Sequence, residues 1–260
     1  MSGRPARAHR ALASALFIVL VGALPVSAAG PAMAPGPATA PVEGSVAAPE
    51  RFILDLYRPG DFVAQTNLVQ CVGASMQMML NIIGPRDDRS AATQRRLFQL
   101  ARSLRDPTVA GNRTWKGASA RGWALGMTTL GAGPYRLDSA RTLDEALAVA
   151  ARAIRLTGRP VGLLVWEGKH AWVMSGFEAT ADPARDPTAQ IVAVRVLDPL
   201  YPRSSPRWGA SPAPDAHLTV ERLARVFVPW RPHSRNTTLR NRYVLVLPYQ
   251  PSRPATLRIG

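Results

Sequence analysis

The stretch PVGLLVWEGKHAWVMSGFEA, residues 160–179, decides the fold class of this chain. Two apolar runs within it flank the short polar sequence EGK, and such runs separated by a three-residue turn that contains Gly predict a β-hairpin. Two later apolar runs, IVAVRVL (191–197) and RYVLVLP (242–248), predict further strands. The C-terminal part of the chain is therefore expected to form an antiparallel sheet.

The part of the chain before the hairpin shows helical periodicity. Apolar side chains recur every three or four positions from Val72 to Ile83, which predicts a buried helix that ends at Gly84-Pro85. Thr142 and Glu145 form a capping box that predicts the start of another helix, which is expected to end at Gly158. The remaining expected elements are an extended segment at 51–58 and helices at about 89–104, near 117–130 and at about 219–227. Helices followed by strands are typical of an α+β domain in which N-terminal helices and a C-terminal sheet pack as two layers.

The first 28 residues have the pattern of an export signal. Three arginines precede an apolar run at 11–26, and the small residues at 26–28 permit cleavage after Ala28. The chain is therefore expected to be secreted. The apolar run is short for a bilayer span and contains Gly22 and Pro25, so an uncleaved membrane anchor is the alternative.

Residues 29–50 predict a flexible linker. They are mostly Ala, Pro and Gly, and a segment with so few large side chains cannot offset its ordering entropy by burial. Residues 51–260 are expected to form one folded domain, since 47% of the chain is hydrophobic and this length suits a single core.

The charge of the chain narrows the class of partner. The 260 residues include 32 basic and 17 acidic side chains, which give a net charge of +15. Thirty of the basic residues are Arg and two are Lys, and they are scattered rather than interleaved with aromatic residues. This scattered distribution indicates a general compositional bias toward Arg and not a specific nucleic-acid interface. The strongest charge-driven interaction that we expect is a weak contact with anionic wall or membrane polymers. A basic protein that binds surfaces by charge alone is a further hypothesis.

Cys71 is the residue that most strongly indicates chemistry, and a lone cysteine excludes an intramolecular disulfide. It stands at the start of the predicted buried helix, where partial positive charge and free N–H groups favour a thiolate. His170 begins a predicted strand directly after the turn, and Asp198 ends the next strand. If these strands are neighbours, Asp198 can orient an imidazole that takes the thiol proton. Gln65, six positions before the cysteine, could donate its amide to an oxyanion.

Other interpretations of these residues stay open. Free cysteines are often buried, so Cys71 could simply fill the core. Gln70 is a rival to Gln65, and His217 and His233 are two further histidines in Pro-rich segments expected to be surface loops. A Cys-His-Asp set could also bind zinc, but no local metal-binding motif supports this, so neither a metal nor a cofactor is expected.

These residues resemble the papain-like cysteine peptidases, in particular the branch of bacteriocin-processing (double-glycine leader) peptidases and their secreted relatives. The similar pieces are QTNLVQC (65–71), HAWVMSGF (170–177), Asp198-Pro199 and LTVERL (218–223). The resemblance implies a papain-like fold over about 51–248, in a stand-alone member without transporter domains. In one departure from the family pattern, Val72 stands where members usually carry Gly.

Two functions are expected from the residues and the resemblance together. The first is a secreted bacterial cysteine peptidase that cleaves a peptide or protein substrate through Cys71, His170 and Asp198, with Gln65 as oxyanion donor. The alternative is a catalytically silent papain-like module that binds peptides or cell-wall polymers.

Overall fold

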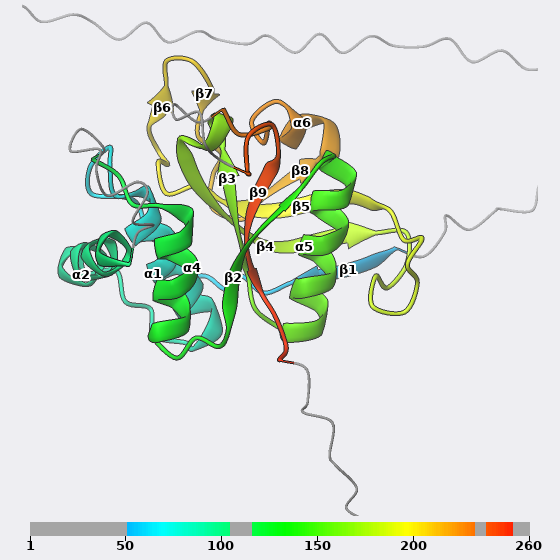
Figure 1. The fold of residues 1–260 in the computed structure, drawn as a ribbon, viewed down its shortest axis with the longest axis horizontal. Helices are drawn as coiled ribbons and strands as arrows, with labels where there is room; N and C mark the ends of the chain where they lie inside the picture. Colours follow the sequence, from blue (N-terminus) through cyan, green and yellow to red (C-terminus); the bar gives the residue numbers. More distant parts are fainter. Residues whose placement is uncertain (1–50, 105–115, 232–237, 252–260) are drawn as a thin grey trace, which may run out of the picture. The chain divides into compact units, whose positions relative to one another are not determined.

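The predicted hairpin lies within an antiparallel sheet that carries helices on both of its faces (Figure 1). The computed structural model describes residues 51–104, 116–231 and 238–251. All of these residues belong to one compact unit, Ala47–Gly260. The mixed architecture of helices and an antiparallel sheet is the one that the sequence predicted.

The elements follow the sequence patterns closely. The helices are α1 (Cys71–Ile83), α2 (Ala91–Ser103), α4 (Ala120–Thr129), α5 (Leu143–Thr157), α6 (Val220–Ala224) and the 3-10 helix η1 (Trp166–Gly168). The strands are β1 (Phe52–Asp55), β2 (Tyr135–Ala140), β3 (Val161–Val165), β4 (His170–Ala179), β5 (Ile191–Leu197), β6 (Ser204–Ser205), β7 (Gly209–Ala210), β8 (Ala216–Thr219) and β9 (Tyr243–Pro248). Every expected helix and strand is confirmed, with its ends shifted by about three residues at most.

The order and register of the strands position two candidate site residues. The main sheet runs β2-β9-β3-β4-β5-β8, β1 also pairs with β4, and all of these pairs are antiparallel. Val165 of β3 lies opposite His170, and Val173 of β4 lies opposite Leu197 of β5. The beginning of β4 therefore lies beside the end of β5, where Asp198 follows directly.

The central strands alternate their side chains between two separate cores, so the expected two-layer arrangement is wrong. Val161, Leu163 and Val165 face a core that α5 covers. Leu164 of the same strand faces a second core, which α1, α2 and α4 cover. Figure 1 shows α5 on one side of the sheet and those three helices on the other. The reason is the position of β2. In the sequence β2 lies between α4 and α5, and in the sheet it is an edge strand. The chain therefore passes from α4 on one face, through this edge, to α5 on the opposite face.

Local sequence signals fix the ends of the longest helix. The side chain of Thr142 accepts a hydrogen bond from the Glu145 N–H, and the Glu145 carboxylate accepts one from the Thr142 N–H, which completes the predicted capping box. Gly158 ends α5 with φ 62°, a left-handed conformation that glycine adopts without steric cost.

Four of the strands, namely β2, β6, β7 and β8, carry no clear signal in the sequence. The β2 sequence YRLDSA is largely polar, and the β8 sequence AHLT is short and follows a Pro-rich segment. The expectation that His217 lies in a surface loop is therefore wrong, because His217 lies on β8 opposite Arg195. Its Nε2 lies 2.8 Å from Glu178 Oε1.

Several expectations lie outside the described residues. They are the export signal at 1–28, the linker at 29–50 and the loop position of His233. Within 51–104, 116–231 and 238–251, no helix is both long and apolar enough to cross a membrane.

Candidate active site

Cys71 is the first residue of α1, and its sulfur lies against the start of β4. Ser75 Oγ donates a 3.2 Å hydrogen bond to the carbonyl of Ala171, which ties the helix to that strand. Burial would raise the pKa of the Cys71 thiol, but the hydrogen bond and charge of His170 outweigh it, helped by the backbone N–H groups of Ala171 and Val72. The pKa therefore lies below its ordinary value, and the sulfur is biased toward the thiolate form.

His170 lies between Cys71 and Asp198 and is 5% exposed. Its Nε2 is 2.7 Å from Asp198 Oδ1, which leaves Nδ1 for the Cys71 sulfur. Burial would lower the pKa of His170, but the hydrogen bonds with Asp198 and Cys71 raise it to about 9. A lowered thiol pKa beside a raised imidazole pKa favours a thiolate–imidazolium pair at neutral pH.

Asp198 is fully buried and is held by three donors. Its Oδ1 accepts from His170 Nε2 and, at 2.8 Å, from the backbone N–H of Leu200. Its Oδ2 accepts from the hydroxyl of Ser211. A buried carboxylate held in this way has one orientation, and it imposes that orientation on the imidazole.

Gln65 is 3% exposed and lies in the loop that leads into α1. Its backbone N–H donates to the carbonyl of Pro199 at 2.7 Å, so this loop contacts the turn that follows Asp198. The side-chain Nε2 donates one N–H to Asn67 O at 2.8 Å and keeps a second N–H for another acceptor. The Oε1 atom has no hydrogen-bond partner among the described residues. The rival Gln70 instead accepts from the Thr66 hydroxyl through its side-chain oxygen.

Sequence reasoning missed three residues around His170, namely Ser211, Trp166 and Trp208. Trp166 stacks on His170 with ring centroids 4.1 Å apart, and Trp208 stacks on Trp166 at 6.3 Å. The aromatic residues on either side of the hairpin turn were a signal for this stack, but Trp208 comes from a loop with no periodicity. Ser211 likewise lies in a segment where no pattern points to a role.

The hairpin turn itself has an unusual backbone. Trp166 and Glu167 have φ values of 57° and 60°, in the left-handed region that few residues with side chains adopt. Gly168 follows with φ 84°, and a Cβ there would collide with the Trp230 indole. This backbone places the ring of Trp166 against the imidazole of His170.

The assembled side chains can perform acyl transfer. The thiolate is a nucleophile, the imidazolium is a proton donor, and backbone and amide N–H groups lie near the sulfur and in the loop before it. Among the described residues, no group of three or more His, Cys, Asp or Glu side chains is arranged to hold a metal ion.

Comparisons with known proteins match this chain to solved structures only. No protein-family model matches it, and no curated protein matches it. One of the solved structures that match is UfSP from C. elegans, with 18% identity and a TM-score of 0.38. The match covers 70% of this chain but only 30% of that structure's chain. A likeness of this degree assigns no activity to this chain.

Proposed function

We propose that the chain is a papain-like cysteine peptidase, a thiol hydrolase that cleaves a peptide bond. The observation that carries the proposal is the buried 2.7 Å contact of His170 with Asp198. Beside this pair, at the start of a helix, lies Cys71, and the pKa of its thiol is lowered. A cysteine that only fills a core needs no ionisable partner. A cysteine that attacks a carbonyl needs a base, and the base needs a group that orients it.

The proposed reaction begins with attack of the Cys71 thiolate on the carbonyl carbon of the peptide bond. The oxyanion that forms accepts hydrogen bonds from the backbone N–H of Cys71 and from the second N–H of the Gln65 amide. His170 Nδ1 gives its proton to the leaving amine as the C–N bond breaks, and a thioester remains on the sulfur. Water then attacks the thioester, His170 accepts a proton from that water, and the thiolate and a carboxylic acid product are released.

The substrate class in this proposal is a peptide or a protein, and the site of action is outside the cytoplasm. Secretion is inferred from the sequence of residues 1–28. Weak contact with anionic wall or membrane polymers is inferred from the net charge of +15.

The ionisation of Cys71 can be tested without a known substrate. At about pH 6, iodoacetamide should alkylate Cys71 at least tenfold faster than it alkylates a free-thiol peptide, because only the thiolate reacts. Replacing His170 with Ala should abolish this advantage, whereas Arg95→Gln on the exposed side of α2 should preserve it. A wild-type rate no faster than that of the peptide would contradict the nucleophile.

Peptide cleavage is tested with a peptide library incubated with the wild type and with the Cys71→Ala variant. We expect cleavage by the wild type alone. A catalytically silent module that binds peptides or wall polymers is the second candidate, and one observation favours it: Gln65 Nε2 already donates to Asn67 O within its own loop. That candidate predicts equal peptide binding by both proteins and no cleavage by either.

A further inference from the structure

Glu167 stands in the hairpin turn three residues before His170 and contacts three basic side chains. Its Oε2 lies 3.0 Å from Lys169 Nζ, and its Oε1 lies 2.9 Å from an Arg207 guanidinium nitrogen and 3.8 Å from one of Arg231. The backbone N–H of Arg231 also donates to the Glu167 carbonyl at 3.2 Å. One carboxylate thus faces three cations, and two positive charges remain without compensation from Glu167.

The exposure of these side chains shows which of them can reach a ligand. The Glu167 side chain is only 10% exposed, whereas those of Lys169, Arg207 and Arg231 are 44%, 60% and 74% exposed. The acid is therefore a buried anchor that holds the three cations near one point. Their outer N–H groups remain open to solvent and can donate to an anion.

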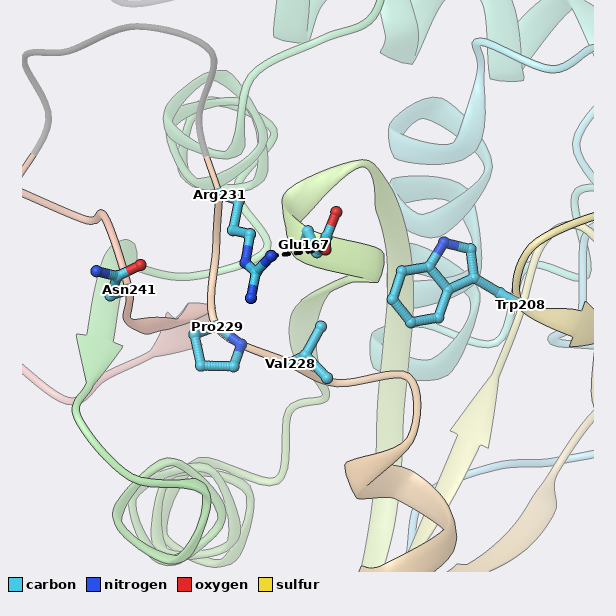
Figure 2. A pocket seen from close by; sticks show the side chains of 6 residues that line it. All are labelled: Glu167, Trp208, Val228, Pro229, Arg231 and Asn241. Carbon is cyan, nitrogen blue, oxygen red and sulfur yellow. Dashed lines mark ion pairs between the residues drawn. The ribbon is translucent and has the colours of Figure 1, made fainter.

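A pocket of about 290 Å³ opens beside this cluster, and Figure 2 shows the side chains that line it. In that view Arg231 points toward Glu167, while Trp208 lies on the other side of the turn. The lining residues are Glu167, Trp208, Val228, Pro229, Arg231 and Asn241. The Arg207 guanidinium also lies 4.9 Å from the centroid of the Trp208 ring, so the cation and the apolar wall adjoin.

The pocket is connected to the proposed catalytic centre through stacked rings. Trp208 stacks on Trp166, and Trp166 stacks on the imidazole of His170. The two centroid distances limit the separation of the His170 imidazole from the Trp208 ring to about 10 Å, which is about the length of three residues of extended peptide. A peptide held at Cys71 can therefore place a nearby side chain or its terminus in this pocket.

We propose that this pocket is a subsite that selects a carboxylate of the peptide substrate, within about three residues of the bond that is cleaved. Arg207, Arg231 and Lys169 bind the carboxylate, and Trp208 with Val228 and Pro229 covers the apolar atoms beside it. The carboxylate comes from an Asp or Glu side chain or from the C-terminus of the peptide. The inference deepens the proposed peptidase function and rests on it, but the binding of the peptide is separable from its cleavage.

The test measures binding to the Cys71→Ala protein, so that it does not depend on catalysis. The probes are fluorescein-labelled octapeptides in matched pairs, with Glu or Gln placed at each position in turn, and each peptide is made with a free or an amidated C-terminus. We expect binding about three- to tenfold tighter for Glu over Gln at one or two adjacent positions, or for the free over the amidated terminus. The first result assigns the subsite to an acidic side chain, and the second assigns it to a chain terminus.

Three charge-matched variants locate the preference. Arg207→Gln and Arg231→Gln, each in the Cys71→Ala background, should reduce the Glu-to-Gln or acid-to-amide ratio to near one. Arg95→Gln removes an equal charge from the exposed side of α2 and should leave the ratio unchanged. Equal binding of all peptides, no binding of any, or an equal loss in Arg95→Gln would overturn the subsite. If the ratio behaves as expected but the wild type cleaves nothing, the subsite stands and the peptidase proposal fails.

Discussion

At the scale of single residues, the lowered pKa of Cys71 and the raised pKa of His170 define a window of pH. Because the pKa of Cys71 is lowered, its thiol stays ionised at lower pH than an ordinary cysteine does. The His170 imidazole stays protonated up to a pH of about 9. Between these limits a nucleophile and a proton donor coexist. Because the imidazolium is lost as the pH rises through about 9, hydrolysis of a fluorogenic peptide should fall there, and kcat/KM should follow a bell-shaped profile.

Asp198→Asn changes that profile in a defined direction. The substitution removes the charge that helps to raise the pKa of His170, so the alkaline limb should move to lower pH and kcat/KM should fall by at least about a hundredfold. Asp144→Asn, at an exposed position of α5, is the charge-matched control and should leave the profile as it is. An alkaline limb that stays at the same pH in Asp198→Asn would show that His170 does not set it.

In the proposed mechanism, Ser211 positions Asp198 and acts on the reaction only through that carboxylate. Ser211→Ala leaves Oδ2 of the buried Asp198 without its hydroxyl donor, which should cost about 1–3 kcal/mol of stability. Peptide hydrolysis should show kcat lowered about tenfold with little change in KM, and Ser211→Thr should restore it because the hydroxyl returns. Ser204→Ala in the same region removes an exposed hydroxyl and serves as the control. Loss of stability with an unchanged kcat would limit Ser211 to a structural role.

At the scale of the elements, Gly162 is a position where β3 packs closely against a side chain of α4. A Cβ there would lie 2.5 Å from a ring carbon of Trp123, a side chain of α4 that is fully buried. Gly162→Ala should therefore lower the free energy of unfolding by about 1–3 kcal/mol, measured by urea denaturation. Gly84→Ala, where the nearest atom is 3.7 Å away, should cost far less. Equal stability of Gly162→Ala and the wild type would show that α4 can shift to make room for the added methyl group.

The elements also show how much of the structure the sequence could predict. Long apolar runs and a capping box revealed the hairpin of β3 and β4 and the limits of α5, because local patterns determine both. The polar strands β2 and β8 escaped detection, since their pairing depends on neighbours and not on their own composition. The face of the sheet that α5 covers was missed for the same reason, because only the path through β2 determines it.

Only part of the candidate site could likewise be predicted from the sequence. The contact between His170 and Asp198 was anticipated, because adjacent antiparallel strands bring the start of one beside the end of the next. Trp208 and Ser211 come from the loops between β5 and β8, where no periodicity exists and only the fold brings them to the site.

At the scale of the whole molecule, the two cores share one sheet. β3 supplies Leu163 to the core under α5 and Leu164 to the core under α1, α2 and α4. Loss of either core therefore removes packing from the same strands, and the two cores should unfold together. Trp172 and Trp123, two of the six tryptophans of the chain, lie in different cores, so Trp172→Phe and Trp123→Phe each remove the signal of one core from the tryptophan fluorescence.

Cooperative unfolding has a clear signature in these two variants. Within each variant, the urea transition followed by tryptophan fluorescence should coincide with the transition followed by far-ultraviolet circular dichroism. Separate midpoints in either variant would show that one face of the sheet opens by itself.

The distribution of the site over α1 and the pair of β4 and β5 determines when the chain becomes reactive. During synthesis Cys71 leaves the ribosome well before His170 and Asp198, and until those strands pair against the helix it is an ordinary thiol. Unfinished chains and chains held unfolded should therefore carry no activated sulfur. Fast alkylation of Cys71 should appear only when folding is complete, so the reactivity of a single sulfur atom would report the folding of the whole domain.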